Sequence, residues 1–256
     1  MAKTVNELSI SCLIPMYNEE ANVRNIIAEA EKMFSQLVSD WEIIIVESGS
    51  TDNTWKRIQE AVKGKGRIRA FHQDRKEGAG SAIRLGHSKC TKDLIFHLEA
   101  DSPFEMIYFK KALPIFLENN CVIGYRVGAP ERNYRWSYYN MGAMAFMRQL
   151  FHDGYNFLLR NLFGLTVKDV NFSFKIFKRE DIQKLDLKSN GWFIDAEILL
   201  ELKRAGVLPI EMPIPYKDRT AGKSTVSCLE PFGMLYEMMR YTSSLRKKQR
   251  TRKKNG

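Results

Sequence analysis

The feature that most constrains this chain is an alternation of two sequence patterns over its first hundred residues. Short apolar runs at 8–14, 41–46, 68–71 and 93–98 predict β-strands. The stretches between these runs repeat apolar residues every three or four positions, as amphipathic helices do. Strands that alternate with helices in this way form a mainly parallel sheet with helices on both faces. The sequence therefore predicts the α/β class.

Polar clusters follow three of these runs, at 15–19, 47–52 and 99–101. Ligands of parallel sheets bind beyond the carboxyl ends of the strands, so the three clusters should converge on one edge. Glu99 and Asp101 are two positions apart, which points both carboxylates to the same side of an extended segment. Hard cations such as Mg²⁺ prefer carboxylate oxygens together with substrate phosphates. The pair therefore indicates a site for a divalent cation next to a pyrophosphate.

The second half of the chain is less regular, and its elements are expected from shorter signals. One helix should end at Gly206, and a segment with three prolines suits the edge of a sheet. The expected elements are a strand at 121–125, an amphipathic helix within 134–165, a strand-like segment at 169–177, a helix at 193–202 and an edge strand at 207–216.

Composition limits the class of protein further. The 256 residues suffice for one α/β domain with a large core. Four cysteines lie far apart without CxxC spacing, which indicates neither a zinc site nor a disulfide framework and fits reduced thiols in a cytoplasmic protein. We expect no signal peptide, because no apolar h-region follows the N-terminus, and no transmembrane helix, because no apolar run reaches about 18 residues.

Residues 229–256 are expected to form an amphipathic helix and basic tail after a catalytic domain at 1–228. Seven Lys and Arg residues in the last eleven, with no acidic residue, supply most of the net charge of +10. An apolar helix face followed by basic residues is typical of a helix on a membrane surface. The alternatives are a disordered tail or a nucleic-acid contact, and nucleic acid is not expected because no aromatic residues interleave the charges. The predicted apolar face comprises Leu229, Phe232, Leu235, Met238, Met239 and Leu245.

Eight short segments together resemble the inverting family 2 glycosyltransferases of GT-A fold. The resemblance is strongest to the polyprenyl-phosphate sugar transferases typified by dolichyl-phosphate mannosyltransferase. It rests on the order and spacing of the segments over roughly residues 8–245. In order, the segments are 14–20, 44–54, 78–84, 98–101, 123–126, 169–175, 192–197 and 218–224.

The resemblance implies a GT-A fold, with a Rossmann-like and mainly parallel sheet. It also implies a metal-dependent, inverting transfer of a sugar from a nucleoside diphosphate to a polyprenyl phosphate or another membrane-presented acceptor. The cofactor would be Mg²⁺ or Mn²⁺. The protein would lie at the cytoplasmic face of a membrane as a peripheral protein, with a membrane partner subunit as a further hypothesis.

The resemblance also implies roles for individual residues. On the donor side, the expected substrate-binding residues are Pro15, Tyr17, Glu19, Glu47, Gly78 and Asp101, with Glu99 and Asp101 as metal ligands. On the acceptor side, the expected catalytic residues are Arg126, Asp169, Asp195 and Glu197, and the loop that closes over the site would contribute Arg219 and Ser224. Purely structural readings stay open for five of these positions. They are core packing for Tyr17, an ordinary loop for Gly78, a surface ion pair for Arg126, and a favourable helix-dipole interaction for the pair Asp195 and Glu197.

Three positions depart from the family's pattern. Glu47 and Glu99 stand where the family usually has Asp, and the extra methylene moves a carboxylate oxygen by about 1 Å, a shift that can cost about 100-fold in rate. Asp153 stands in segment 151–156, where a basic residue is expected.

These departures keep three functions open. The first is transfer to a lipid phosphate, which is already anionic and needs little help from a general base. The second is transfer to a saccharide hydroxyl in cell-surface glycan synthesis, for which Asp169 or Asp195 must take the proton. The third is a nucleotide-sugar-binding pseudoenzyme that serves as an interaction subunit.

Overall fold

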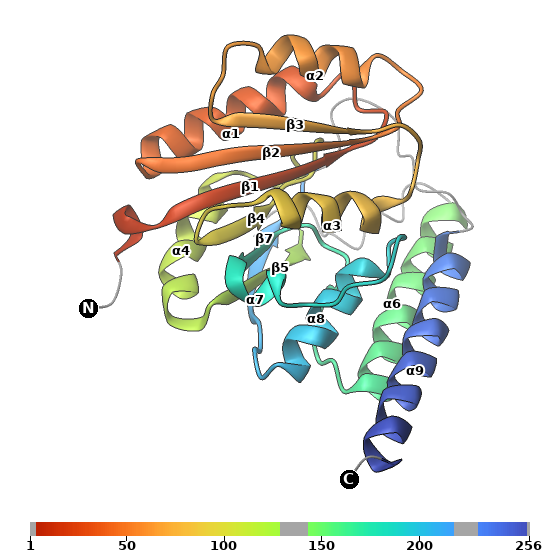
Figure 1. Cartoon of the computed structure of the whole chain (residues 1–256). Coiled ribbons are helices and arrows are strands. Elements are labelled where there is room, and N and C mark those ends of the chain that lie inside the picture. The colour runs from red at the N-terminus through yellow and green to blue at the C-terminus, as the bar shows by residue number, and fades with distance from the viewer. Residues whose placement is uncertain (1–3, 129–142, 218–229, 255–256) are drawn as a thin grey trace.

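A computed structural model describes residues 4–128, 143–217 and 230–254 of the chain. Figure 1 shows a central twisted sheet with helices packed on both of its faces. Within the described residues the sheet has seven strands, in the order β3-β2-β1-β4-β6-β5-β7. The strands are β1 Ser9–Met16, β2 Asp40–Ser48, β3 Ile68–Gln73, β4 Leu94–His97, β5 Cys121–Val127, β6 Lys175–Lys178 and β7 Ile210–Pro215.

The sheet is mainly parallel, as expected for the α/β class. Strands β1 to β4 pair in parallel with one another, and β5 pairs in parallel with β7. Only β6 runs the other way among the described strands, antiparallel to β4 and β5. The carboxyl ends of β1, β2 and β4 therefore lie on one edge, where the predicted donor-side residues follow them.

The helices bury apolar faces against the two sides of the sheet in two separate core clusters. One cluster joins α1, α2 and α4 to the sheet, and the other joins α3, α6, α8 and α9 to the opposite face. In β1, Cys12 and Ile14 belong to the first cluster and Leu13 to the second, as the alternation of a strand requires. The helices are α1 Val23–Leu37, α2 Thr54–Val62, α3 Ala79–Lys89, α4 Ile107–Asn119, α6 Ala143–Phe163, α7 Arg179–Gln183, α8 Ile194–Arg204 and α9 Glu230–Lys254, preceded by the 3₁₀-helix η1 Val5–Glu7.

Most expected elements are present, with changes at their ends. The first strand continues through Pro15 to Met16, and the second includes Glu47 and Ser48. Helix α8 is followed by Gly206 with φ of 84°, and β7 lies at the sheet edge, where its prolines remove no bond from a central ladder. The expected helix within 134–165 corresponds to α6, while residues 134–142 lie outside the described part of the chain.

The prediction of a strand from residue 169 is wrong, because β6 begins only at Lys175. The alternation itself is real, since Phe172, Phe174 and Ile176 all enter the same core cluster. Alternate burial is therefore present before the ladder starts. A strand also needs a neighbour with which to exchange hydrogen bonds, and the paired register of β6 starts at Lys175.

Helix α9 is part of the core over its first turns. Met234, Met238 and Tyr241 are buried, whereas Phe232 and Met239 are 60% and 62% exposed. The prediction of a single apolar face on this helix is therefore wrong, because Met238 is buried against the core while its neighbour Met239 is exposed to solvent. None of the described helices is both long enough and apolar enough to cross a membrane.

Candidate functional site

Hydrogen bonds join the loops that follow β1 and β2 into one unit. The backbone N–H of Asn18, at φ of 55°, donates to Oγ of Ser50 at 2.9 Å, and Asn18 Oδ1 accepts from the N–H of Thr51 at 2.9 Å. The N–H of Glu19 donates to Oγ1 of Thr54 at 2.8 Å. These hydrogen bonds hold the loop after β1 against the loop after β2 at the carboxyl ends of the two strands.

Three predicted donor-side residues lie on or beside the first of these loops. Pro15 is half-buried within β1. The ring of Tyr17 is also half-buried, and the Lys76 ammonium lies 4.4 Å from its centroid. Glu19 is 8% exposed as a residue, and its carboxylate accepts from Nδ2 of Asn22 at 2.6 Å. Their contacts with a nucleotide stay predictions.

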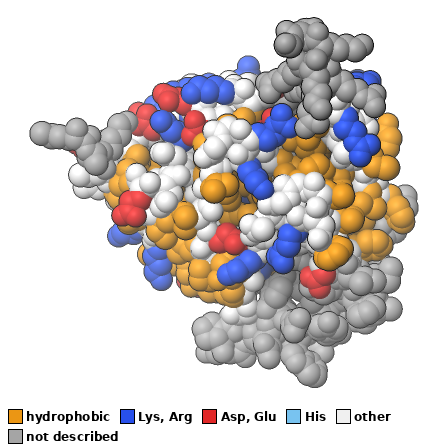
Figure 2. Space-filling view, turned by 90° about the horizontal axis from the view of Figure 1, so that it is seen from below, with side chains coloured by type: hydrophobic (Ala, Val, Ile, Leu, Met, Phe, Trp, Pro, Cys, Tyr) orange, Lys and Arg blue, Asp and Glu red, His pale blue; other side chains and the backbone are white. Residues whose placement is uncertain are grey.

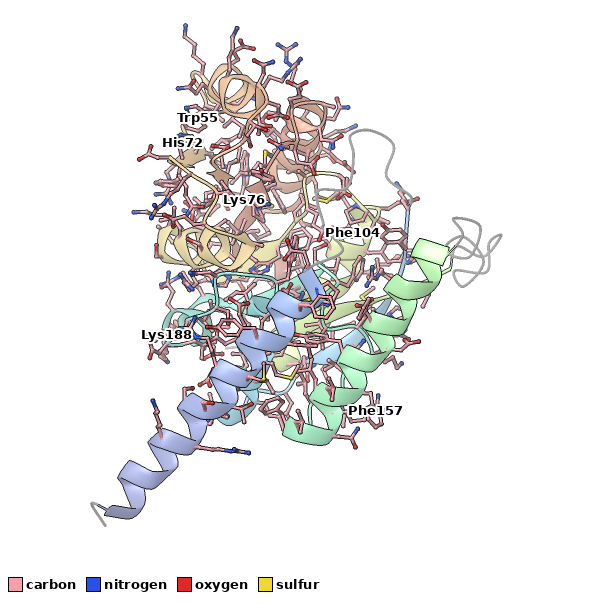
Figure 3. The ribbon with its side chains drawn as sticks, turned by 90° about the vertical axis from the view of Figure 1, so that its right-hand side faces the viewer. Trp55, His72, Lys76, Phe104, Phe157 and Lys188 are labelled. Atoms are coloured by element: carbon pink, nitrogen blue, oxygen red, sulfur yellow. The ribbon has the colours of Figure 1, made fainter. Side chains whose placement is uncertain are left out.

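Glu47 is fully buried and already has two partners. Its Oε1 accepts from the backbone N–H of Ser50 at 2.5 Å, and its Oε2 makes a close contact with Nδ1 of His72. The His72 ring stacks on Trp55, with centroids 4.9 Å apart, and Figure 3 shows the two side by side. The longer side chain at position 47 therefore reaches across to β3, a contact that the sequence did not indicate.

Glu99 and Asp101 flank a tight turn directly after β4. The N–H of Ser102, at φ of 47°, donates to the carbonyl of Glu99 at 3.1 Å, so the pair lies on a turn and not on the expected extended segment. Burial, and next the charge of Asp101, raise the pKa of Glu99 to about 7. Arg126 acts in the opposite direction, lowering this pKa. The two carboxylates are thus close enough to repel each other.

The donor set fits a hard divalent cation. Two carboxylates whose negative charges repel each other are stabilised by a divalent cation between them. Mg²⁺ and Mn²⁺ both take oxygen ligands. The described residues contain no group of three or more His, Cys, Asp or Glu that could hold a metal by themselves. A cation at Glu99 and Asp101 would therefore complete its coordination with water or substrate oxygens, as Mg²⁺ commonly does.

Arg126 and Asp169 form a two-point ion pair on the acceptor side. Nε of Arg126 donates to Oδ2 at 2.6 Å and Nη2 donates to Oδ1 at 3.0 Å, with the side chains 15% and 6% exposed. The guanidinium also lies over the rings of Phe172 and Tyr216. The structure thus brings together two residues that the sequence placed in separate segments, and it joins Arg126 to a partly buried pair.

Asp195 is held by a buried lysine that sequence reasoning missed. Nζ of Lys175 lies 2.8 Å from Oδ1 of Asp195, and the lysine side chain is fully buried. The charges of Lys175 and Asp195 both reach Glu99, the lysine lowering and the aspartate raising its pKa. The available signal was a lysine within the apolar alternation of 172–177, where an unpaired charge would be costly.

Glu197 holds a loop formed by residues 188–191. The residue is 2% exposed, and its carboxylate accepts from the N–H of Lys188 at 3.0 Å and of Ser189 at 2.8 Å. From the other side, Oε1 of Glu237 on α9 accepts from the N–H groups of Asn190 and Gly191, each at 2.9 Å. These contacts give Glu197 a structural role in holding the loop, and its catalytic role stays a prediction.

Gly78 lies where this same loop meets the start of α3. At φ of 99°, a Cβ on Gly78 would lie 2.3 Å from the carbonyl oxygen of Asn190, which also accepts from the N–H of Gly80 at 2.7 Å. A glycine is therefore needed at position 78 because the backbone of Asn190 leaves no room for a side chain there. Its contact with a substrate phosphate stays a prediction.

Three further positions complete the comparison with the sequence. Arg219 and Ser224 lie outside the described residues, so the loop expected to close over the site is not placed. Asp153, where the family's pattern has a basic residue, is exposed on α6. Its position on the helix surface explains how an acidic residue is accommodated there.

Comparison with known proteins places the chain among sugar transferases. The family model described as glycosyl transferase family 2 matches residues 11–186. The chain is 26% identical over 226 residues to glycosyltransferase AglD of Haloferax volcanii, which covers 85% of this chain and 34% of AglD. It is 25% identical over 232 residues to undecaprenyl-phosphate 4-deoxy-4-formamido-L-arabinose transferase of Proteus mirabilis, which covers 90% of this chain and 66% of that protein. The chain thus spans about a third of the first relative and about two thirds of the second.

Solved structures of similar fold include glucosyl-3-phosphoglycerate synthase from Mycobacterium tuberculosis. Its complex with Mn²⁺, UDP and glucosyl-3-phosphoglycerate matches with a TM-score of 0.60 at 17% identity, over 83% of this chain and 73% of that one. Its complex with UDP matches with a TM-score of 0.61 at 17% identity, over 89% and 76%. At this identity the likeness concerns the fold, and it confirms the GT-A fold expected from the sequence.

Proposed function

The chain belongs to glycosyl transferase family 2, and from this premise we propose that it moves a sugar from a nucleoside diphosphate to a lipid phosphate. In a single in-line displacement, an acceptor phosphate oxygen bonds to the anomeric carbon as the bond to the diphosphate breaks. The nucleoside diphosphate leaves and the configuration inverts. Glu99 and Asp101 would hold the divalent cation, which supplies positive charge to offset the charge on the departing diphosphate.

One observation carries the choice of acceptor: all three predicted acceptor-side carboxylates are already engaged. Asp169 is paired with Arg126, Asp195 with Lys175, and Glu197 with backbone N–H groups. A carboxylate stabilised by a close cation is a weak base, because the cation favours its ionised form. A hydroxyl acceptor needs a base to take its proton, whereas a phosphate arrives ionised. The arrangement therefore favours a phosphate acceptor.

A polyprenyl phosphate is the form of lipid phosphate that we favour. The relative from Proteus mirabilis is named as an undecaprenyl-phosphate sugar transferase. Such an acceptor lies in a membrane, so the enzyme must reach the membrane surface. A nucleoside-diphosphate sugar is the donor that agrees with a carboxylate pair suited to Mg²⁺ or Mn²⁺.

Peripheral attachment to the cytoplasmic face of a membrane belongs to the same proposal. Exposed Phe232, Tyr236 and Met239 recur at helical spacing on α9, and the basic residues of the tail follow on the same helix. On the face seen in Figure 2, hydrophobic side chains lie among Lys and Arg side chains. Apolar insertion and attraction to anionic lipid act together in such helices. A membrane partner subunit would strengthen the attachment.

The test uses the purified full chain with Mn²⁺ or Mg²⁺, radiolabelled nucleotide sugars and vesicles that contain polyprenyl phosphate. We expect label in the lipid fraction. Glu99→Gln should abolish this transfer, while Glu118→Gln, an exposed substitution of the same kind on α4, should leave it unchanged. Full activity of Glu99→Gln would contradict the assigned metal site.

The two alternatives give different results in the same assay. Label that moves only to a saccharide acceptor would indicate transfer to a hydroxyl, and one of the engaged carboxylates would then have to act as base. Binding of a nucleotide sugar without transfer to any acceptor would indicate the interaction subunit. Either result would overturn the lipid-phosphate proposal.

A further inference from the structure

Helices α6, α8 and α9 meet beside Asp195. Tyr155 on α6 is 7% exposed and packs in the same core cluster as Phe193, which precedes α8, and as Met234 and Met238 on α9. Ring contacts link α6 to α9 as well, and Figure 1 shows these two helices side by side. The phenol of Tyr155 is therefore fixed at the junction of three helices.

Two buried polar atoms at this junction have no hydrogen-bond partner among the residues that the structure describes. One is the hydroxyl oxygen of Tyr155 and the other is Oε2 of Glu237. The second carboxylate oxygen of Glu237 is engaged, because it accepts from Asn190 and Gly191 at 2.9 Å each. Buried polar groups in folded proteins are nearly always paired, so two unpaired oxygens in one place call for a ligand or an ordered water.

The charges of two carboxylates act on the Tyr155 hydroxyl. Burial raises the pKa of Tyr155 most, and the charges of Asp195 and Glu237 raise it further. The charge of Asp195 also reaches Glu99, which links this junction to the predicted metal carboxylates. Asp195 is thus the residue that connects the two unpaired atoms to the proposed reaction centre.

We propose that Tyr155, Glu237 and Asp195 form a subsite for the hydroxyl groups of the transferred sugar. A sugar hydroxyl can accept a hydrogen bond from the Tyr155 phenol and donate one to a carboxylate, so it satisfies both kinds of unpaired atom. A phosphate group cannot, because Asp195 and Glu237 would repel it. The subsite thus selects the uncharged part of the donor. This inference rests on the proposed function.

Tyr155→Phe tests the subsite by removing one oxygen atom. Binding of UDP and of UDP-glucose, UDP-galactose and GDP-mannose is measured by calorimetry on the full chain with Mn²⁺. We expect the variant to bind UDP as the parent does, and to bind the preferred sugar nucleotide about tenfold more weakly, the effect of one lost hydrogen bond. Its melting temperature should stay equal or rise, since an unpaired buried hydroxyl is removed.

Tyr241→Phe is the matched control. The hydroxyl of Tyr241 donates to Oε1 of Glu201 at 2.6 Å, so this variant loses a satisfied hydrogen bond between α9 and α8. We expect it to melt at a lower temperature and to bind sugar nucleotides as the parent does. The two tyrosine variants should therefore show opposite patterns of stability and binding.

Three results separate the possibilities. A parent chain that binds none of the sugar nucleotides contradicts the proposed function itself. If the parent binds a sugar nucleotide and Tyr155→Phe binds it equally tightly, the subsite is overturned. The partner of the Tyr155 hydroxyl would then be an ordered water. Equal loss of UDP and sugar-nucleotide affinity in Tyr155→Phe also overturns it, because the hydroxyl would then act on the nucleotide.

Discussion

The ammonium group of Lys175 lies 2.8 Å from Oδ1 of Asp195, with the two side chains 0% and 8% exposed. Nζ of Lys175 also donates to the carbonyl of Phe172. The pair therefore fastens the first turn of α8 to the segment that leads into β6. Since a buried charge without its partner is costly, each side chain depends on the other for its place.

The first prediction concerns this ion pair. Lys175→Met should lower the free energy of unfolding by about 3–5 kcal/mol, because Asp195 would stay buried without a cation. Lys175→Met combined with Asp195→Leu should recover most of this loss, since two apolar side chains can replace a buried pair. Denaturant unfolding followed by circular dichroism measures both. A double variant no more stable than the single one would show that the pair is not coupled in this way.

The second prediction concerns pH and Glu99. In the folded chain its pKa is raised by burial and Asp101 to about 7, against about 4.5 for an ordinary glutamate. The folded state then holds this proton more tightly, so stability falls as the pH rises from about 4.5 to about 7 and stays low above that window. Without metal, the free energy of unfolding of Glu99→Gln should therefore be about 1–2 kcal/mol higher than that of the parent near pH 8. Near pH 4.5 the variant should be no more stable than the parent.

Denaturant unfolding in EDTA at both pH values measures this difference. Glu105→Gln, at an exposed position nearby, changes the net charge equally and should show no gain at either pH. Addition of Mn²⁺ near pH 8 should stabilise the parent and not Glu99→Gln, because a ligand that binds only the folded state raises its stability. If the free energy of unfolding changed with pH by the same amount in Glu99→Gln and in the parent, the raised pKa of Glu99 would be contradicted.

Much of the sheet could be predicted because its strands are short apolar runs with helices of clear periodicity between them. The ends of β1 and β2 were placed too early, since Pro15 and Glu47 look like loop residues in sequence. Both are tolerated in the strands: Pro15 lies near the end of β1, and Glu47 finds Ser50 and His72 as partners.

The candidate site could be predicted only in part. The family's motifs indicated Glu99 and Asp101, which follow β4, and Arg126, which lies near the end of β5. Asp169 was indicated by the resemblance alone, because the strand expected from that residue is absent. Pairings between distant segments left no local signal. Glu237 on α9 binds the backbone of Asn190, and no spacing in the sequence connects the two. A buried lysine such as Lys175 implies a partner without identifying it.

The third prediction concerns the glycine at the start of α3. Gly78→Ala should lose about 2 kcal/mol or more, because a Cβ would meet the Asn190 carbonyl at 2.3 Å and because φ is 99°. Gly66→Ala is the control, since none of the described residues has an atom within 4 Å of its added Cβ, and it should be neutral or stabilising by about 0.4–1 kcal/mol. Thermal unfolding measures both. If Gly78→Ala lost donor binding with unchanged stability, the glycine would serve a ligand and not the Asn190 contact.

The last prediction concerns the exposed side chains of α9. The chain should sediment with vesicles rich in anionic lipid, and less so as NaCl rises from about 0.1 M to about 0.5 M, because salt screens the basic tail. Phe232→Ser with Met239→Ser should weaken this binding at least about tenfold, since two apolar side chains no longer enter the lipid. Leu208→Ser, at a position 63% exposed outside α6 and α9, should change it little. Equal binding by all three proteins would leave the charges alone as the cause of attachment and contradict apolar insertion.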